Sequence, residues 1–347
     1  MGRQPIPIHQ IAIHAGVSDA TVDRVLHDRG GVRDSTTARV KRAIAELKEQ
    51  QALFEVGGRV FTVDLVMVAP QRFSSAVWNS FDTAIPALRP AVFRIRPHMH
   101  ERIEPTHLIG TLDKIATRGT QAIILKAPDL PEVIEAVDLL ADQGVPVITI
   151  VTDLPTSNRV AYVGIDNQAA GATAAYLISQ WLPTTSDGED HKNVLVTLSS
   201  QRFRGEGERE IGFHATAEEI APSWRTFELA ETDGLDATIS EQLAHLADTR
   251  PIDAVYSIGG GNRATLDTLQ RHGQRPGVYI AHDLDADNRH LLRRGQISAV
   301  LHHDLGTDAL RACQLIMQFH GAVPGRPATR ATPIQVITPY NTPNQRS

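Results

Sequence analysis

The sequence contains almost no cysteine and no long apolar run, and both absences exclude classes of protein. Cys313 is the only cysteine among 347 residues, so no internal disulfide forms. This suits a reducing compartment, and we expect the cytoplasm. We interpret Cys313 as a packed hydrophobe rather than a nucleophile. No window reaches the roughly 18 apolar residues of a membrane span, and the start, MGRQPIPIHQ, lacks a signal-peptide core. The sequence therefore predicts a protein without membrane association.

Motifs of catalysis and cofactor binding are also absent. There is no G-x-x-x-x-G-K-[ST] loop, and the GGGN segment at 259–262 is not G-x-G-x-x-G. Residues 302–304, His-His-Asp, alternate between the two faces of an expected strand and are poor joint metal ligands. His98 and His100 share a face but lie in an expected exposed loop. We expect no enzyme activity, no cofactor and no metal site.

The charge is unevenly distributed along the chain. The formal net charge is −6, yet residues 1–60 hold nine Lys/Arg and seven Asp/Glu, which gives +2 there and −8 for the remainder. Only the N-terminal segment therefore favours phosphates, and only weakly. Hydrophobic residues make up 41% of the chain and charged residues 21%, which is typical of globular domains.

Residues 8–51 have the spacing of a small helical domain. Apolar residues fall at helical intervals at Ile11, Ala15, Val17, Val22 and Val25. Gly16 can adopt the positive φ of a tight corner, and Ser18 can cap a second helix with Asp19 in its first turn. A third helix is expected from about Ser35. This pattern is typical of a helix-turn-helix, whose second helix enters the DNA major groove.

The second helix presents the predicted DNA contacts. Because Val22 and Val25 must face the core, Thr21 and Arg24 should face outward, with the helix start nearest the base edges. The predicted DNA-binding residues are Ser18, Asp19, Ala20, Thr21, Arg24 and Arg33. The alternative is a three-helix cap that binds no nucleic acid.

From Thr62 onward, short apolar runs alternate with amphipathic helical segments, which indicates parallel α/β sheets. Strands are expected at 63–69, 91–96, 122–126, 145–151, 162–165, 193–198, 226–229, 254–258, 278–282 and 298–301. These are too many strands for one sheet, so we divide them near Gly164 and Ile297. We expect an α/β protein with a three-helix headpiece and linker at 1–57 and two doubly wound parallel lobes at 62–347. The first lobe comprises 62–163 plus 298–347, and the second comprises 164–297.

Doubly wound lobes bind ligands at the carboxyl ends of their strands. Polar residues at these ends, with one aromatic, form the predicted ligand site: Phe73, Asp153, Arg204, Arg209, Asn262, Asp283 and His303. Asp153 can accept two vicinal hydroxyls or make a turn before Pro155. Arg209 can bind ring oxygens or a carboxylate, or form a surface ion pair.

The other predicted ligand contacts also have structural alternatives. Asn262 follows three glycines, which allow close approach to a ligand or a simple turn. Asp283 ends a buried strand and is harder to explain as structure. Phe73 can stack on a sugar or cover the core. We assign Asp166 and Gly171 instead to architecture, as a helix cap and a close-packing site.

The chain resembles the lactose/galactose repressor (LacI/GalR) family. The headpiece shares the A-G-V-S corner, T-V-x-R-V-L and V-x-x-x-T-x-x-R-V-x-x-A-I-x-E-L. VPVITIVTDLP, YVGIDNQAAG, R-x-x-G-F at 209–213, GGGN, HDL and PIQVITPYNTPN resemble the family's effector domain, which is similar to periplasmic sugar-binding proteins. The resemblance covers residues 6–344.

This resemblance implies a cytoplasmic homodimer that binds pseudo-palindromic double-stranded operator DNA and responds to a small effector, a sugar or polyol. A repressor is the expected role. The family's R-x-x-x-x-L hinge helix is missing, so Leu53 serves either as an apolar wedge or within a simple tether. His303 replaces a common glutamine, which could alter ligand choice or pH response. The rival interpretations are a periplasmic-type sugar receptor, which a signal peptide would reveal, and an enzyme.

Overall fold

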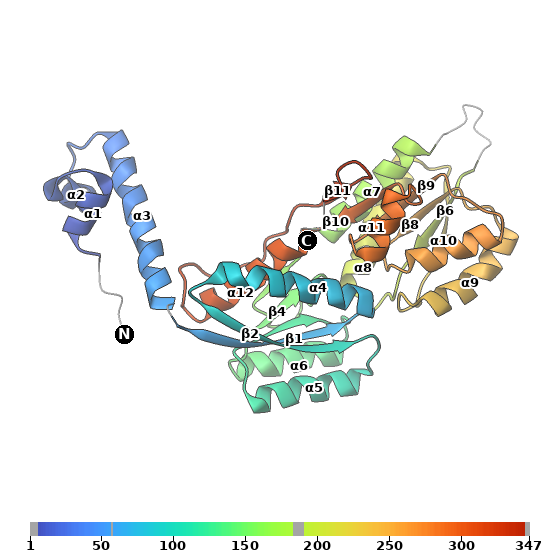
Figure 1. The fold of residues 1–347 in the computed structure, drawn as a ribbon, viewed down its shortest axis with the longest axis horizontal. Coiled ribbons are helices and arrows are strands. Elements are labelled where there is room, and N and C mark those ends of the chain that lie inside the picture. The colour runs from blue at the N-terminus through green and yellow to red at the C-terminus, as the bar shows by residue number, and fades with distance from the viewer. Residues whose placement is uncertain (1–5, 57, 183–190, 344–347) are drawn as a thin grey trace.

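The computed structural model describes residues 6–56, 58–182 and 191–343, with the side chains of 48–56 left out. Three helices stand at one end of the molecule, and two α/β lobes follow (Figure 1). No helix in the described ranges is long and apolar enough to cross a membrane.

The headpiece consists of α1 (Ile8–Ala15), α2 (Asp19–Leu26) and α3 (Asp34–Val56). The expected corner forms, with Gly16 at φ 61° and the Ser18 hydroxyl accepting a hydrogen bond from the Thr21 amide at 3.3 Å. Seven buried apolar residues form its core: Ile11, Ala12, Ala15, Val22, Val40, Ala43 and Leu47. The helix-turn-helix expected from the sequence is therefore present.

Helix α3 is continuous to Val56, immediately before the predicted glycine break. No separate hinge helix interrupts it between residues 34 and 56. Gly57 and the side chain of Leu53 lie outside the described residues.

The first lobe is a five-stranded parallel sheet in the order β2-β1-β3-β4-β5. Its strands are β1 (Val60–Val68), β2 (Val92–His100), β3 (Ala122–Lys126), β4 (Val147–Ile150) and β5 (Ala161–Val163). Its helical segments are α4 (Gln71–Ala84), η1 (Ile85–Leu88), α5 (Pro105–Arg118) and α6 (Pro131–Asp142). Helices α5 and α6 cover one face, while α4 covers the other together with α12 (Leu305–Phe319) (Figure 1).

The second lobe is a six-stranded sheet in the order β11-β10-β9-β8-β6-β7, parallel except for β11. Its strands are β6 (Asn193–Thr197), β7 (Arg225–Leu229), β8 (Ala254–Ser257), β9 (Val278–His282), β10 (Ala299–His302) and β11 (Gln335–Ile337). Its helices are α7 (Asn167–Trp181), α8 (Arg204–Ile220), α9 (Asp236–Thr249), α10 (Asn262–Arg271) and α11 (Ala286–Arg293). Each predicted strand has a counterpart, whereas the three-residue β11 was not predicted.

The chain crosses between the lobes three times. The first crossing follows β5, near the predicted Gly164. The second was predicted at Ile297, and this is wrong because β10 pairs with β9 in the second sheet. The chain instead returns to the first lobe in α12, which packs against α4, β4 and β5. It then crosses again, past a bridge between Ile165 and Thr332, to place β11 beside β10.

Strand β2 also corrects the expectation of an exposed loop around His98. The strand continues to His100, and the His98 Nε2 atom lies 2.8 Å from Oδ1 of the fully buried Asp64. Arg96 and Arg118 pair with the same carboxylate. His98 thus helps to satisfy a buried charge.

Helices α7 and α8 pack in direct backbone contact. A Cβ atom on Gly171 would lie 1.8 Å from the Arg209 carbonyl oxygen, and one on Gly212 would lie 2.1 Å from the Gln168 carbonyl oxygen. Asp166 caps α7 by accepting a hydrogen bond from the Ala169 amide at 3.0 Å. These two glycines set the position of α8, whose first turns face the cleft.

Candidate functional site

A cavity of about 270 Å³ lies between the lobes. The first lobe contributes the loop between β1 and α4 and the end of β3, and the second contributes the first turns of α8 and the end of β9. The volume is near the lower limit of ordinary ligand pockets, about 300–1,000 Å³, so the cavity suits a small ligand. Charged side chains from both lobes line it, which favours a ligand rich in hydrogen-bonding groups.

Arginine side chains of the first lobe contact the second lobe across the cleft. Arg72 Nη2 donates to the Gly234 carbonyl oxygen at 2.6 Å, and its Nε lies 3.7 Å from Asp285. Arg102 pairs with Asp233 at 2.6 Å. These contacts span the two lobes, so opening the cleft breaks them.

Arg209 reaches the cavity from the second turn of α8 and is 3% exposed. Its Nε donates to the Asn167 side-chain oxygen at 2.9 Å. Asn167 is the first residue of α7, so the α7–α8 contact positions the guanidinium as well as the backbone. The guanidinium fork can bind two ligand oxygens.

Asp283 follows β9 and lines the cavity with a positive φ of 64°. The Asn288 amide supports this backbone by donating to the carbonyl oxygens of His282 and Asp283 at 2.8 and 2.7 Å. Asn262 in turn donates to Asn288 at 2.6 Å. The conformation that directs Asp283 is therefore held by a network of buried amides.

His303 stands behind Asp283, 1% exposed, and connects two carboxylates. Its Nε2 lies 3.3 Å from Asp283 Oδ1, and its Nδ1 contacts Asp308 on α12. Burial opposes a charge on His303, but hydrogen bonds and attraction from both carboxylates raise its pKa to about 9. Burial likewise opposes ionisation of Asp283, whose pKa the His303 and Arg209 charges hold well below its usual range. At neutral pH the site contains a charged histidine between two carboxylates.

One oxygen of Asp283 has an unmet hydrogen-bonding capacity. Oδ1 is shielded from solvent, and its 3.3 Å contact with His303 Nε2 is an ion pair whose angle departs from that of a well-aligned hydrogen bond. A buried carboxylate oxygen of this kind favours a donor from a ligand. A ligand hydroxyl in the cavity would satisfy it.

Lys126 closes the floor of the cavity from the end of β3. Its Nζ donates to the Val68 carbonyl oxygen at 3.0 Å and lies 3.8 Å from the centre of the Phe203 ring. Burial lowers its pKa to about 8, with Arg209 adding to the effect and Glu206 and Asp283 opposing it. Lys126 is therefore a cationic hydrogen-bond donor that loses its proton at a lower pH than an ordinary lysine does.

Three of the seven predicted ligand residues line the cavity: Phe73, Arg209 and Asp283. The structure does not bring Asp153 into it, because both carboxylate oxygens bind Arg159 at 2.5 and 2.6 Å. Arg204 is 42% exposed and pairs with Glu208 and, more distantly, Asp129. Asn262 and His303 do not line the cavity themselves. Asn262 contacts Asn288 and His303 contacts Asp283, and these two partners do line it.

The charged lining residues that were not predicted include Arg72, Lys126, Glu206 and Asp285. Arg72 and Lys126 follow or end predicted strands, so their position was available from the sequence. Glu206 lies one helical turn before Arg209. This spacing places Glu206 at the cavity only when the bounds and direction of α8 are known. Burial raises the pKa of Asp285 to about 6, despite the nearby Arg72 charge.

The headpiece exposes the predicted DNA-contact residues on and after α2. Arg24, Arg33, Asp19 and Ala20 are exposed, and Thr21 is half-buried. The Ser18 and Thr21 hydroxyls lie 2.9 Å apart and cap the helix. Asp19 stands 3.4 Å from His9. Two arginines thus face solvent near a capped helix start, as contact with phosphates and base edges requires.

Comparisons with known families match the headpiece and the two-lobed domain separately. The family described as "Periplasmic binding protein domain" matches residues 68–319, and "Bacterial regulatory proteins, lacI family" matches residues 7–48. The lacI family is non-enzymatic, which agrees with the expectation of no catalysis.

Individual relatives support each part separately. The sucrose operon repressor of Vibrio alginolyticus is 46% identical over 39 residues, which are 11% of this chain and 42% of that protein. A glucose-galactose binding protein of Geobacillus stearothermophilus superposes with a TM-score of 0.71 at 19% identity, over 82% of this chain and 100% of that one. A solute-binding protein of Burkholderia graminis C4D1M, in complex with D-arabinose, gives 0.71 at 18% identity over 82% and 97%. At these identities the structures show the fold alone.

Proposed function

Because this chain belongs to the periplasmic-binding-protein domain family and carries a lacI-family helix-turn-helix, we propose that it represses transcription under the control of a small sugar. The observation that carries this proposal is the position of the headpiece, directly before a cleft that closes between two lobes. A DNA-binding regulator with a sugar-binding-like effector domain is the general class. The role of repressor, the ligand and the dimer are the specific proposals.

The ligand is proposed to be a sugar or polyol. The cavity is small and charged, with Arg209 and Lys126 as donors and Asp283 as an acceptor. Phe73 offers an apolar face of the kind that packs against a sugar ring. Related folds bind glucose or galactose and D-arabinose, and the similar headpiece belongs to a sucrose operon repressor.

The DNA partner is proposed to be a pseudo-palindromic operator, bound in the cytoplasm by a homodimer. A single headpiece covers one half-site, and two-fold symmetry of the protein matches that of the DNA. A sugar alters operator affinity only if it binds one arrangement of the lobes more tightly than another. The Arg72 and Arg102 contacts across the cleft are present only in the closed arrangement, so they contribute to that difference.

The test is a gel-shift assay on the DNA flanking the gene, repeated with a panel of neutral sugars. Arg24→Ala should weaken operator binding by at least about tenfold, because it removes an exposed cation at the proposed interface. Arg293→Ala makes the same charge change on α11 and serves as the control. Asp283→Asn should keep operator binding and lose the sugar response. If Arg24→Ala binds the operator as tightly as wild type, the proposed docking is wrong.

A further inference from the structure

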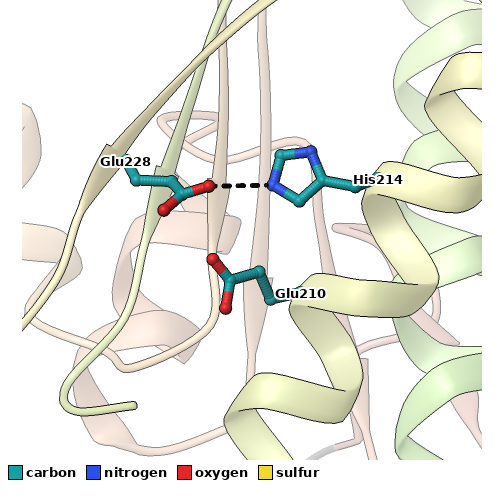
Figure 2. Close-up of side chains that lie close together, drawn as sticks. All are labelled: Glu210, His214 and Glu228. Atoms are coloured by element: carbon teal, nitrogen blue, oxygen red, sulfur yellow. Dashed lines mark ion pairs between the residues drawn. The ribbon is translucent and has the colours of Figure 1, made fainter.

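Three potential metal ligands converge on the second lobe, outside the ligand cavity. Glu210 and His214 are one helical turn apart on α8, and Glu228 lies on the neighbouring strand β7 (Figure 2). Figure 2 shows the His214 ring directed toward the Glu228 carboxylate, with the Glu210 carboxylate beside them. Helix spacing therefore supplies two ligands, and the sheet supplies a third.

The separations are close to those of a metal centre. One donor atom from each residue lies within 4.8 Å of the others, and His214 Nε2 is 3.2 Å from Glu228 Oε1. Ligand bonds of about 2.0–2.2 Å in tetrahedral geometry place donor atoms roughly 3.3–3.6 Å apart. Small side-chain rotations would bring all three donors to that spacing. No other group of three such residues meets this criterion among the described side chains of 6–47, 58–182 and 191–343.

The His214 ring also has an unmet hydrogen-bonding capacity. Its Nε2 is shielded from solvent and makes no hydrogen bond to the described residues, because the angle to Glu228 is unsuitable. Two carboxylates and an unsatisfied imidazole nitrogen thus face a common point, where a cation would satisfy all of them.

We propose that Glu210, His214 and Glu228 bind a divalent transition-metal ion, with Zn²⁺ as the preferred ion. One imidazole and two carboxylates, with water in the fourth position, form a three-ligand site of the kind that Zn²⁺ occupies. Mg²⁺ and Ca²⁺ prefer oxygen ligands alone, so the histidine selects against them.

The proposed site is linked to the ligand cavity through α8. Glu210 directly follows Arg209, and Glu206, one turn earlier, lines the cavity. A metal ion shared by α8 and β7 would fix this helix against the edge strand of the sheet. It would thereby hold Arg209 in its position toward the cavity.

The test is a calorimetric titration of the full chain, free of any affinity tag, with Zn²⁺ alone. It measures the affinity for the ion and the number of ions bound. Wild type should bind one ion with these ligands. Glu210→Gln and His214→Gln should each weaken that binding by about a hundredfold or more, since loss of supporting groups around a metal site already costs 10–100-fold. Glu228→Gln, on the edge strand, provides a third variant in case a helix variant fails to fold.

A matched control is available on α9, where Glu241 and His245 have the same helical spacing and are exposed. They are not part of a three-residue cluster among the described residues. Glu241→Gln and His245→Gln should leave Zn²⁺ binding unchanged, and Mg²⁺ should not compete. The proposal is overturned if wild type binds no Zn²⁺, if the α8 and β7 variants bind it as wild type does, or if the α9 variants lose it equally.

Discussion

At the scale of single residues, His303 joins the ligand cavity to the first lobe. It contacts Asp283 in the cavity wall and Asp308 on α12, which packs against α4. A protonated imidazole carries an N–H toward each carboxylate and attracts both by its charge, whereas a neutral one has a single N–H. The charge on His303 therefore stabilises the junction between the lobes.

This charge gives a pH dependence whose sign follows from the raised pKa. A histidine with a folded-state pKa of about 9 and an unfolded value near 6.5 contributes its full stability below pH 6.5 and loses it as the pH rises through 9. Wild type should therefore lose about 1–3 kcal/mol between pH 6.5 and 9.5 relative to His303→Gln. Urea unfolding across this range measures the difference.

The neighbouring His302 is the control for that experiment. Burial lowers its pKa to about 4, so it is neutral throughout the same window. His302→Gln should retain the pH dependence of wild type. An identical pH profile for wild type and His303→Gln would contradict a raised pKa of His303 in the folded protein.

Arg209 and Arg204 provide a second residue-scale prediction. Both are on α8, but only Arg209 lines the cavity. Arg209→Gln should reduce sugar affinity by roughly ten- to a hundredfold, because a charge-assisted hydrogen bond contributes about 1.5–3 kcal/mol. Arg204→Gln should leave it unchanged. Calorimetry with a sugar that releases the operator measures both, and equal losses would contradict the assignment.

Asp153 and Asp283 show what the sequence leaves undetermined at this scale. Each follows a buried strand and precedes a loop, so the pattern predicts the same role for both. Their environments differ because Arg159, six residues after Asp153, folds back onto its carboxylate. Asp283 instead has its backbone fixed by Asn288, five residues later, and its carboxylate is left without such an arginine. Both contacts depend on the conformation of the loop after the strand, which periodicity does not describe.

At the scale of secondary-structure elements, the α7–α8 contact controls the site. Gly171→Ala should destabilise the protein by at least about 1–3 kcal/mol, since its Cβ would overlap the Arg209 carbonyl oxygen. It should also weaken sugar binding, because Arg209 must move with α8. Urea unfolding and calorimetry measure the two effects.

Gly207→Ala is the matched control on α8. Nothing lies within 4 Å of a Cβ at that position, so the change should be neutral or stabilise the helix by about 0.5–1 kcal/mol. Equal destabilisation by both substitutions would mean that the close backbone contact is not the cause.

Most elements could be predicted from the sequence, but their assignment to lobes could not. Two strands, at Ala122–Lys126 and Val278–His282, have the predicted bounds, because continuous β-branched and aliphatic runs mark buried strands. The apolar sequence of β10 would suit a buried strand in either lobe. Its placement therefore depended on where the chain was assumed to cross between the lobes. Strand β11 is too short to show any period.

At the scale of the whole molecule, the uneven charge makes DNA binding depend on assembly. An N-terminal segment whose residues 1–60 carry +2 gains little from phosphates, and nonspecific binding gives dissociation constants of only about 10⁻⁴–10⁻⁶ M. We expect the full chain to bind its operator in the range of about 10⁻⁸–10⁻¹¹ M. A fragment of residues 1–57 should bind weakly and without specificity.

Fluorescence anisotropy with operator and scrambled DNA compares the two proteins at one salt concentration. Circular dichroism of the fragment separates weak binding from loss of its three helices. Equal specific affinity for a helical fragment and for the full chain would argue against binding as a dimer.

The late return of α12 to the first lobe affects the order in which the protein can fold during synthesis. The first sheet leaves the ribosome early, but Ala309, Cys313 and Ile316, which pack with Phe61 and Phe81, are made only after nearly all of the second lobe. One apolar face of the nascent first sheet therefore lacks part of its cover until the strands β6 to β10 of the second lobe have been synthesised. Strand β11, made later still, completes the second sheet. Neither lobe is a contiguous stretch of chain, so an interrupted translation product leaves both unfinished.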